Sequence, residues 1–296
     1  MKFRLLALCM SILWIGMGVW DGRAQDTVGA THKTTDKSSE IKLEKMGGSF
    51  RGANSIYMTS QPLIYVVESA NHRFLVLNEQ GKRIDSVGNQ GFGNYQFDRP
   101  VDIDATNGLK IYVSDYNNGR IQVFDRRLQF LSSITPPVGN EQFYSYQPTE
   151  LTISDNRELF FYEKDSGRLV QYNENGELLA SMRVRTDRRL RSPADLDTYG
   201  GDVLLADSSR GVLHFLQPGG QYVKFVGRLQ GICAISTSSQ GIWALTPDRL
   251  VHLSGKGRFK NEYTWVNDIQ PVDLEVNGTM AYILTRNSLW RTRIDK

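Results

Sequence analysis

Short apolar runs alternate with polar turns along most of the chain, and one arrangement recurs. In Ile111–Asp125, an apolar run ends at Asp115, a polar turn follows, and Arg120 begins a second apolar run. Two apolar runs joined by such a turn predict a β-hairpin. The arrangement returns around residues at positions 68, 115, 163, 207, 246 and 285, which are 47, 48, 44, 39 and 39 residues apart. The pattern therefore predicts six related structural units.

Each unit has room for four strands and none for a helix. A short strand precedes each hairpin, as at 101–103 and 151–153, and several of these strands follow a proline. Proline is tolerated at the first residue of a strand, where no ladder bond is lost. A fourth strand follows in the early units, as at 83–87 and 130–134. Repeats of this length built from short strands are typical of a β-propeller, with one blade for each repeat.

The last unit has no fourth strand of its own, because residues 289–294 lie almost at the end of the sequence. Residues 40–46 alternate polar and apolar positions and belong to no unit. We expect this N-terminal strand to pair with the last blade and close the ring, which removes exposed strand edges. The predicted fold is an all-β, six-bladed propeller of four-stranded blades over residues 40–296.

The first residues predict export. A basic start at Lys2 and Arg4 precedes an apolar run of 16 residues at 5–20, and small polar residues follow. This order is typical of a secretory signal peptide, and the run is shorter than the ~20 residues of a membrane-spanning helix. We assign residues 1–25 to the signal peptide and the polar residues 26–39 to a flexible linker. An uncleaved anchor is the alternative; after cleavage no membrane span is expected, and the product is periplasmic or extracellular.

Residues 89–103, followed by 111–115 and 117–124, resemble an NHL repeat. The likeness is fair in the units around positions 68, 163 and 207 and weak in the last two. This resemblance implies a six-bladed propeller. It implies less about function, because the family includes scaffolds, ligand-binding proteins and a few enzymes.

An acidic residue at the start of the turn and an arginine at its end recur in the early units. Such a carboxylate can accept hydrogen bonds from turn amides, and the arginine can reach back to it. Because the arrangement is repeated around the ring, we interpret it as structural. The residues concerned are Glu68, Arg73, Asp115, Arg120, Glu163, Arg168 and Asp207.

Net charge and composition limit which binding and catalytic functions the sequence supports. The net charge of +3 is too small to indicate nucleic-acid binding. After signal cleavage one cysteine remains, Cys233, in an apolar stretch typical of a buried position. The amidating lyase of the NHL family holds zinc through histidines. Here His32, His72, His214 and His252 suggest no converging set of three.

Carboxylates on the predicted innermost strands are the candidate metal ligands. Asp102, Asp195 and Asp273 occupy the same position in three units, and Glu150 lies near it in a fourth. Six-bladed lactonases bind calcium in the central channel through such oxygen ligands, and a ring of carboxylates suits a hard cation. The alternatives are a solvated channel lining or partners for the turn arginines. We therefore predict either no cofactor or calcium.

The loops on the face that carries the acidic turns are rich in aromatic and arginine residues, which are enriched at binding hot spots. The alternative is that the aromatics pack between blades and the arginines are solvated. The candidates are Tyr95, Tyr116, Phe143, Tyr144, Tyr146, Arg183, Arg185, Arg188, Arg189, Arg191, Arg210, Tyr263 and Trp265.

Two functions follow from these patterns. The first is an exported, non-catalytic binding or scaffold protein, monomeric or part of a complex, with a protein, peptide or glycan partner in the cell envelope. The second is a metal-dependent lactonase or lyase that works in the channel with calcium or zinc. The absence of a complete catalytic set in the sequence favours the first.

Overall fold

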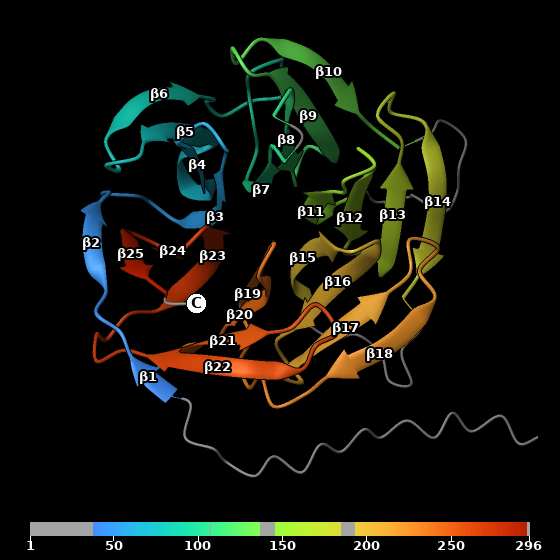
Figure 1. Ribbon diagram of the computed structural model, residues 1–296. Coiled ribbons are helices and arrows are strands. Elements are labelled where there is room, and N and C mark those ends of the chain that lie inside the picture. The colour runs from blue at the N-terminus through green and yellow to red at the C-terminus, as the bar shows by residue number, and fades with distance from the viewer. Residues whose placement is uncertain (1–37, 107, 137–145, 185–192, 295–296) are drawn as a thin grey trace, which may run out of the picture. The chain divides into compact units, whose positions relative to one another are not determined.

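A computed structural model describes residues 38–106, 108–136, 146–184 and 193–294. Six sheets stand around a central axis as the blades of a propeller, and the four strands that build each blade are antiparallel (Figure 1). The described residues contain one short helical element, the 3₁₀ turn η1 (Ser69–Asn71). The predicted all-β, six-bladed propeller is confirmed.

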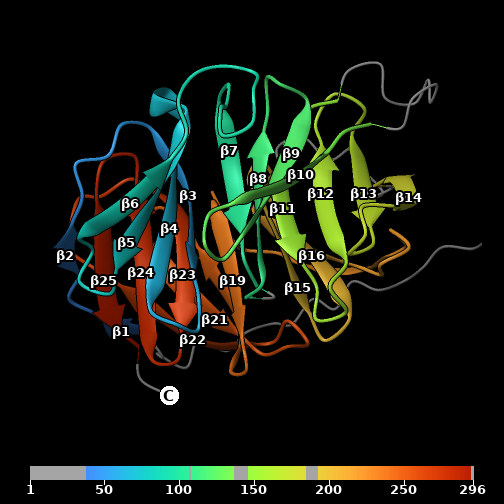
Figure 2. The same ribbon diagram turned by 90° about the horizontal axis from the view of Figure 1, so that it is seen from above.

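In each blade the first strand lies nearest the axis and the last lies at the rim (Figure 1). Seen from the side, blade two stands between blades one and three (Figure 2). Blade one consists of β3 (Ala53–Met58), β4 (Leu63–Glu68), β5 (Arg73–Asn78) and β6 (Arg83–Val87). Blade two consists of β7 (Pro100–Asp104), β8 (Lys110–Asp115), β9 (Arg120–Asp125) and β10 (Phe130–Ile134). Blade three consists of β11 (Pro148–Ile153), β12 (Leu159–Glu163), β13 (Arg168–Tyr172) and β14 (Leu178–Arg183).

The remaining blades follow the same order. Their strands are β15 (Pro193–Tyr199), β16 (Asp202–Asp207), β17 (Val212–Leu216), β18 (Tyr222–Val226); β19 (Ala234–Ser238), β20 (Gly241–Leu245), β21 (Arg249–Leu253), β22 (Phe259–Thr264); β23 (Pro271–Asn277), β24 (Met280–Thr285) and β25 (Leu289–Arg293). Prolines begin β7, β11, β15 and β23, where their missing N–H costs no ladder bond.

The N-terminal strand completes blade six. Strand β2 (Glu44–Gly47) pairs antiparallel with β25, with Glu44 opposite Arg291 and Lys45 opposite Trp290. The Arg291 guanidinium also binds the Glu44 carboxylate at 3.0 Å. The predicted ring closure is therefore confirmed.

A second N-terminal strand was not anticipated. Strand β1 (Ser38–Glu40) pairs in parallel with β22 and gives blade five a fifth strand. Its residues are polar and exposed, so no apolar alternation marks it in the sequence. Strands β1 and β2 thus lie along the rims of two successive blades, five and six.

The core consists of apolar clusters between neighbouring blades. Between blades one and two, Phe74 packs edge to face against Phe124, with ring centroids 5.6 Å apart. In blade five, the fully buried Trp243 stacks on His252 at 3.9 Å between ring centroids. Burial raises the pKa of the Cys233 thiol to about 12, so it stays protonated at neutral pH. Among the described residues, no helix is long and apolar enough to cross a membrane.

Candidate functional site

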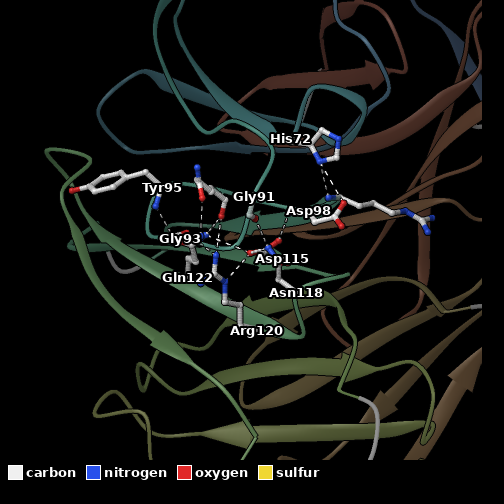
Figure 3. Close-up of polar contacts among 11 residues, drawn as sticks. His72, Gly91, Gly93, Tyr95, Asp98, Asp115, Asn118, Arg120 and Gln122 are labelled. Carbon is white, nitrogen blue, oxygen red and sulfur yellow. Dashed lines mark hydrogen bonds and ion pairs between the residues drawn. The ribbon is translucent and has the colours of Figure 1, made fainter.

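Asp115 organises the turn that joins β8 to β9. Its buried carboxylate accepts hydrogen bonds from the backbone N–H of Asp98, the Asn118 side-chain amide and Nε of Arg120, each at 2.8 Å (Figure 3). Burial raises the pKa of Asp115, and the hydrogen bonds from Asn118 and Arg120 oppose that rise. The carboxylate thus fixes the turn and also the chain that enters blade two at Asp98.

The same network holds the loop at 89–99, which connects blades one and two. The Arg120 guanidinium donates to the carbonyl oxygens of Gly93 and Gln96, both at 2.9 Å, and Asn118 donates to the carbonyl of Gly91 at 2.8 Å (Figure 3). Hydrogen bonds at three points along its backbone attach this loop to the turn of blade two.

The equivalent turns of blades one and four share this plan, and that of blade three departs from it. In blade one, Nε of Arg73 lies 2.6 Å from the Glu68 carboxylate. In blade four, Arg210 lies 3.9 Å from Asp207. In blade three, Glu163 instead accepts from the backbone of Gln147 and Ser166, and Arg168 turns toward the rim to donate to the Ser181 carbonyl.

Cationic side chains flank an aromatic ring beside the blade-two turn. The guanidinium carbon of Arg99 lies 4.9 Å, and the Lys164 ammonium 5.5 Å, from the ring centroid of Tyr116. The backbone N–H of Arg99 donates to Nδ1 of His72 at 3.2 Å, and this histidine nitrogen lies 3.6 Å from the Asp98 carboxylate (Figure 3). These contacts place two solvent-facing cations on the face that carries the loop at 89–99.

The central channel is lined by carboxylates on the first strands of alternate blades. Asp102, Asp195 and Asp273 each accept the N–H of the following residue with Oδ1. Their Oδ2 atoms each accept an N–H from the first strand of the next blade, at 2.6–2.7 Å. The donors of these bonds are Leu151, Ile235 and Ile56. These bonds join blades two and three, four and five, and six and one, and the Ser55 hydroxyl of blade one also donates to Asp102 of blade two.

A second ring of carboxylates lies two residues further along the same strands. It consists of Asp104, Asp197 and Glu275, with Tyr57, Thr152 and Ser236 from the intervening blades. Asp104 accepts the N–H of Ile153 at 3.0 Å, repeating the inter-blade bond of the first ring. The two rings border a cavity of about 160 Å³.

Burial and mutual repulsion raise the pKa of the channel carboxyl groups. Burial is the larger cause for Asp102, Asp195 and Glu275, and neighbouring carboxylates add to it. The pKa reaches about 7 for Asp197 and Asp273. Parts of these side chains remain open to the cavity, so solvent there moderates the effect of burial.

The raised pKa values predict how stability depends on pH. Asp197 and Asp273 release their protons near pH 4 in the unfolded chain and near pH 7 in the folded channel, so the folded state binds more protons between those values. Their contribution to stability therefore increases as the pH falls from 7 toward 4. The lowered pKa of His252 acts in the opposite direction below about pH 6.5.

The substitution Asp197→Asn tests the contribution of one channel carboxyl group to stability separately from that of His252. At pH 8 we expect the variant to melt about 3 °C above the wild type, corresponding to ~1 kcal/mol, because one buried charge is gone. The advantage should shrink toward zero at pH 5, where the wild-type carboxyl is protonated. Differential scanning fluorimetry at constant ionic strength measures both melting points. A difference independent of pH would show that Asp197 does not titrate in this range.

The predicted metal ligands are brought to the channel but are engaged with backbone amides. Asp102, Asp195 and Asp273 lie in one ring, and the Glu150 pKa is raised by burial nearby. In the part of the chain that the structure describes, no group of three or more His, Cys, Asp or Glu side chains is arranged to hold a metal ion. Both carboxylate oxygens of each ring aspartate thus accept backbone N–H groups, and calcium binding stays a prediction.

The proposed binding residues differ in exposure, and some lie outside the described residues. Tyr116, Tyr146 and Tyr263 are buried, and Trp265 packs against the core between blades five and six. Tyr95 and Arg183 are exposed, and Arg210 is half-buried beside Asp207. Outside the described residues lie Phe143, Tyr144, Arg185, Arg188, Arg189 and Arg191.

Two further features belong to these sites. Phe92 is 69% exposed on the blade-two loop, and the Arg120 guanidinium lies 4.9 Å from its ring centroid. Asp104, Asp197 and Glu275 form the second carboxylate ring. The spacing of two residues in "VDID", "ADLD" and "VDLE" is the available signal, because alternate strand residues face the same side.

Comparisons with known proteins agree with the fold. The NHL repeat family matches residues 97–124, and no curated protein matches the sequence significantly. A putative gluconolactonase shares 12% identity and a TM-score of 0.65, with 86% of this chain and 94% of that chain covered. A virginiamycin B lyase from Staphylococcus aureus shares 10% identity and a TM-score of 0.61, covering 87% and 90%. At these identities the likeness concerns the fold alone.

Proposed function

We propose that this six-bladed propeller, which carries an NHL repeat, is a non-catalytic binding protein that presents its blade-two loop to a protein, peptide or glycan partner. One observation carries the proposal. The loop at 89–99 is bonded to the turn below it, yet it exposes 69% of Phe92 and 39% of Tyr95. Aromatic residues, Phe and Tyr among them, are enriched at the cores of protein interfaces.

The geometry favours binding for an entropic reason. A partner that contacts a fixed loop does not lose the free energy needed to order that loop. Arg99 and Lys164 lie on the other side of the same turn and add positive charge to this face. Acidic or hydroxyl-rich groups on a partner would complement the combination of aromatic and cationic side chains.

The predicted signal peptide supports the choice of partner. If residues 1–25 direct export, the loop faces the periplasm or the medium, where envelope proteins, peptides and glycans are the available ligands. The propeller would then act as a monomer or as one component of an envelope complex.

Phe92→Ala tests the proposal. The tagged propeller, cross-linked in envelope extract from its native source, should enrich a partner that the variant captures roughly thirtyfold less well, corresponding to ~2 kcal/mol. The variant should fold normally, because the ring is mostly exposed. Ile84→Ala is the matched control, since Ile84 is 55% exposed on the rim strand β6. Equal capture by both variants and the wild type would refute a role for the loop.

The alternative of a metal-dependent lactonase or lyase has one observation in its favour. Carboxyl groups whose pKa lies near 7, such as Asp197 and Asp273, can exchange protons at neutral pH, as general acids and bases do. Metal analysis of the purified protein, together with a lactone-hydrolysis assay, distinguishes this alternative from binding.

A further inference from the structure

A cleft of about 520 Å³ opens between blades three and four. One wall comes from blade three and includes Arg168, Met182 and Arg183. The other wall comes from the turn between β17 and β18 and the start of β18, with Gly220 and Tyr222. A volume of this size is in the range of small-molecule sites, roughly 300–1,000 Å³.

Arg168 faces this cleft because it departs from the pattern of the other turn arginines. In blades one and two, the equivalent Arg73 and Arg120 bind their own turn carboxylates at 2.6 and 2.8 Å. Arg168 instead donates through Nη1 to the Ser181 carbonyl, at 2.9 Å. The carboxylate of Glu163 is satisfied by Ser166 and by the backbone N–H of Gln147 and Asp165.

Arg183 faces the cleft because blade three has a longer rim strand. In blades one and two the last rim pairs join Val87 to Phe74 and Ile134 to Ile121. In blade three the corresponding pair joins Met182 to Leu169, and one further pair places Arg183 opposite Arg168. The residues that follow Val87 and Ile134 are glycine and threonine, so a cation occupies this position in blade three and in neither of these two.

Two arginines directly opposite each other repel and destabilise a sheet. Among the described residues, no carboxylate lies within 4.0 Å of either guanidinium. An anion that enters the cleft would relieve this repulsion and accept charge-assisted hydrogen bonds from both groups.

The rest of the cleft suits an organic molecule. The thioether of Met182 and the ring of Tyr222 provide apolar surface beside the arginines. Gly220 adopts a φ of +71°, and a Cβ there would lie 2.9 Å from the Met182 sulfur. Glycine thus brings the blade-four backbone against Met182.

We propose that this cleft binds an organic phosphate or sulfate ester. The tetrahedral oxyanion lies between the guanidinium groups of Arg168 and Arg183, and the apolar part of the ester lies against Met182 and Tyr222. Three terminal oxygens allow a tetrahedral group to accept from two guanidinium groups at once. The site goes beyond the proposed function, because it lies at the interface of blades three and four and shares no residue with the loop at 89–99.

Titration of the whole protein with phenyl phosphate, monitored by two-dimensional NMR, tests the site. We expect saturable shifts at Gly220 and Tyr222, and affinity about tenfold lower in Arg183→Gln, since one charge-assisted contact is lost. Arg168→Gln should lose a similar factor. Arg157→Gln is the control, because Arg157 is an exposed arginine of the same blade paired with Glu174 at 3.4 Å. It should bind as the wild type does.

Further probes distinguish the sources of the anion. Phenyl sulfate that binds as tightly as phenyl phosphate supports a site for either ester, and preference for one identifies it. Benzyl alcohol should not bind measurably, because it has no charge. Inorganic phosphate that binds as tightly as phenyl phosphate would overturn the role of the apolar wall. Unchanged affinity in Arg183→Gln, or no saturable binding of either ester, would overturn the site, and neither result bears on capture through Phe92.

Discussion

Deleting residues 38–47, which form β1 and β2, is expected to lower the melting temperature by about 10 °C. The deletion removes the rim strand of blade six and the buried side chain of Leu43, and it removes Met46 from the cluster around Phe50 and Tyr282. Burial of two such side chains contributes ~3–6 kcal/mol, and each kcal/mol shifts the melting temperature by about 2–4 °C in a domain of this size. Differential scanning calorimetry measures the shift.

A shorter deletion provides the control. Removing Ser38–Glu40 alone takes away β1, whose three residues are exposed, and should lower the melting temperature by less than about 3 °C. The longer deletion also exposes the edge of β25, so concentration-dependent aggregation should accompany the loss of stability. If both deletions melt with the wild type, the terminal strands do not contribute to closing the ring.

Asp115→Ala should lower the free energy of unfolding by about 3–5 kcal/mol, the usual result of removing one partner from a buried ion pair. The substitution leaves the Arg120 guanidinium buried without its carboxylate and removes the acceptor of the Asp98 amide. It also loosens the turn that holds the loop at 89–99 through Gly91 and Gly93. Urea unfolding followed by tryptophan fluorescence measures the change.

Two comparisons show whether the ion pair causes the loss. The double variant Asp115→Ala/Arg120→Ala should recover at least ~1 kcal/mol, because no buried charge is left unpaired. Asp207→Ala should cost less than Asp115→Ala, because Arg210 lies 3.9 Å from Asp207 and the pair is looser. A loss below ~1 kcal/mol for Asp115→Ala would mean that the carboxylate does not anchor the turn.

The sequence was sufficient for the fold because each blade repeats one pattern. The alternation of short apolar runs, the prolines at the starts of first strands and the unpaired segment at 40–46 predicted six blades and their closure. Strand β1 escaped prediction because its pairing with β22 uses backbone groups, and its polar side chains carry no alternation.

The candidate sites were less predictable, because they depend on which face of an element a residue occupies. Tyr116 and Tyr263 lie in stretches that resemble loops in sequence, but both side chains are buried, Tyr263 in the apolar cluster of blades five and six. Arg168 has the same place in its repeat as Arg120. It instead donates to the carbonyl of Ser181 on the rim strand. Which acceptor an arginine reaches is decided by distances that a repeat pattern does not contain.

The Oδ2 atoms of Asp102, Asp195 and Asp273 each bond to the next blade at the hub, and one of these bonds spans the junction between the ends of the chain. At that junction Asp273 holds Ile56 from inside while β2 holds β25 from outside. The ring is therefore fastened twice where the polypeptide is discontinuous. Loss of the pairing between β2 and β25 leaves the bond from Ile56 to Asp273 in place. The rim of blade six is therefore expected to separate before blades six and one part at the hub.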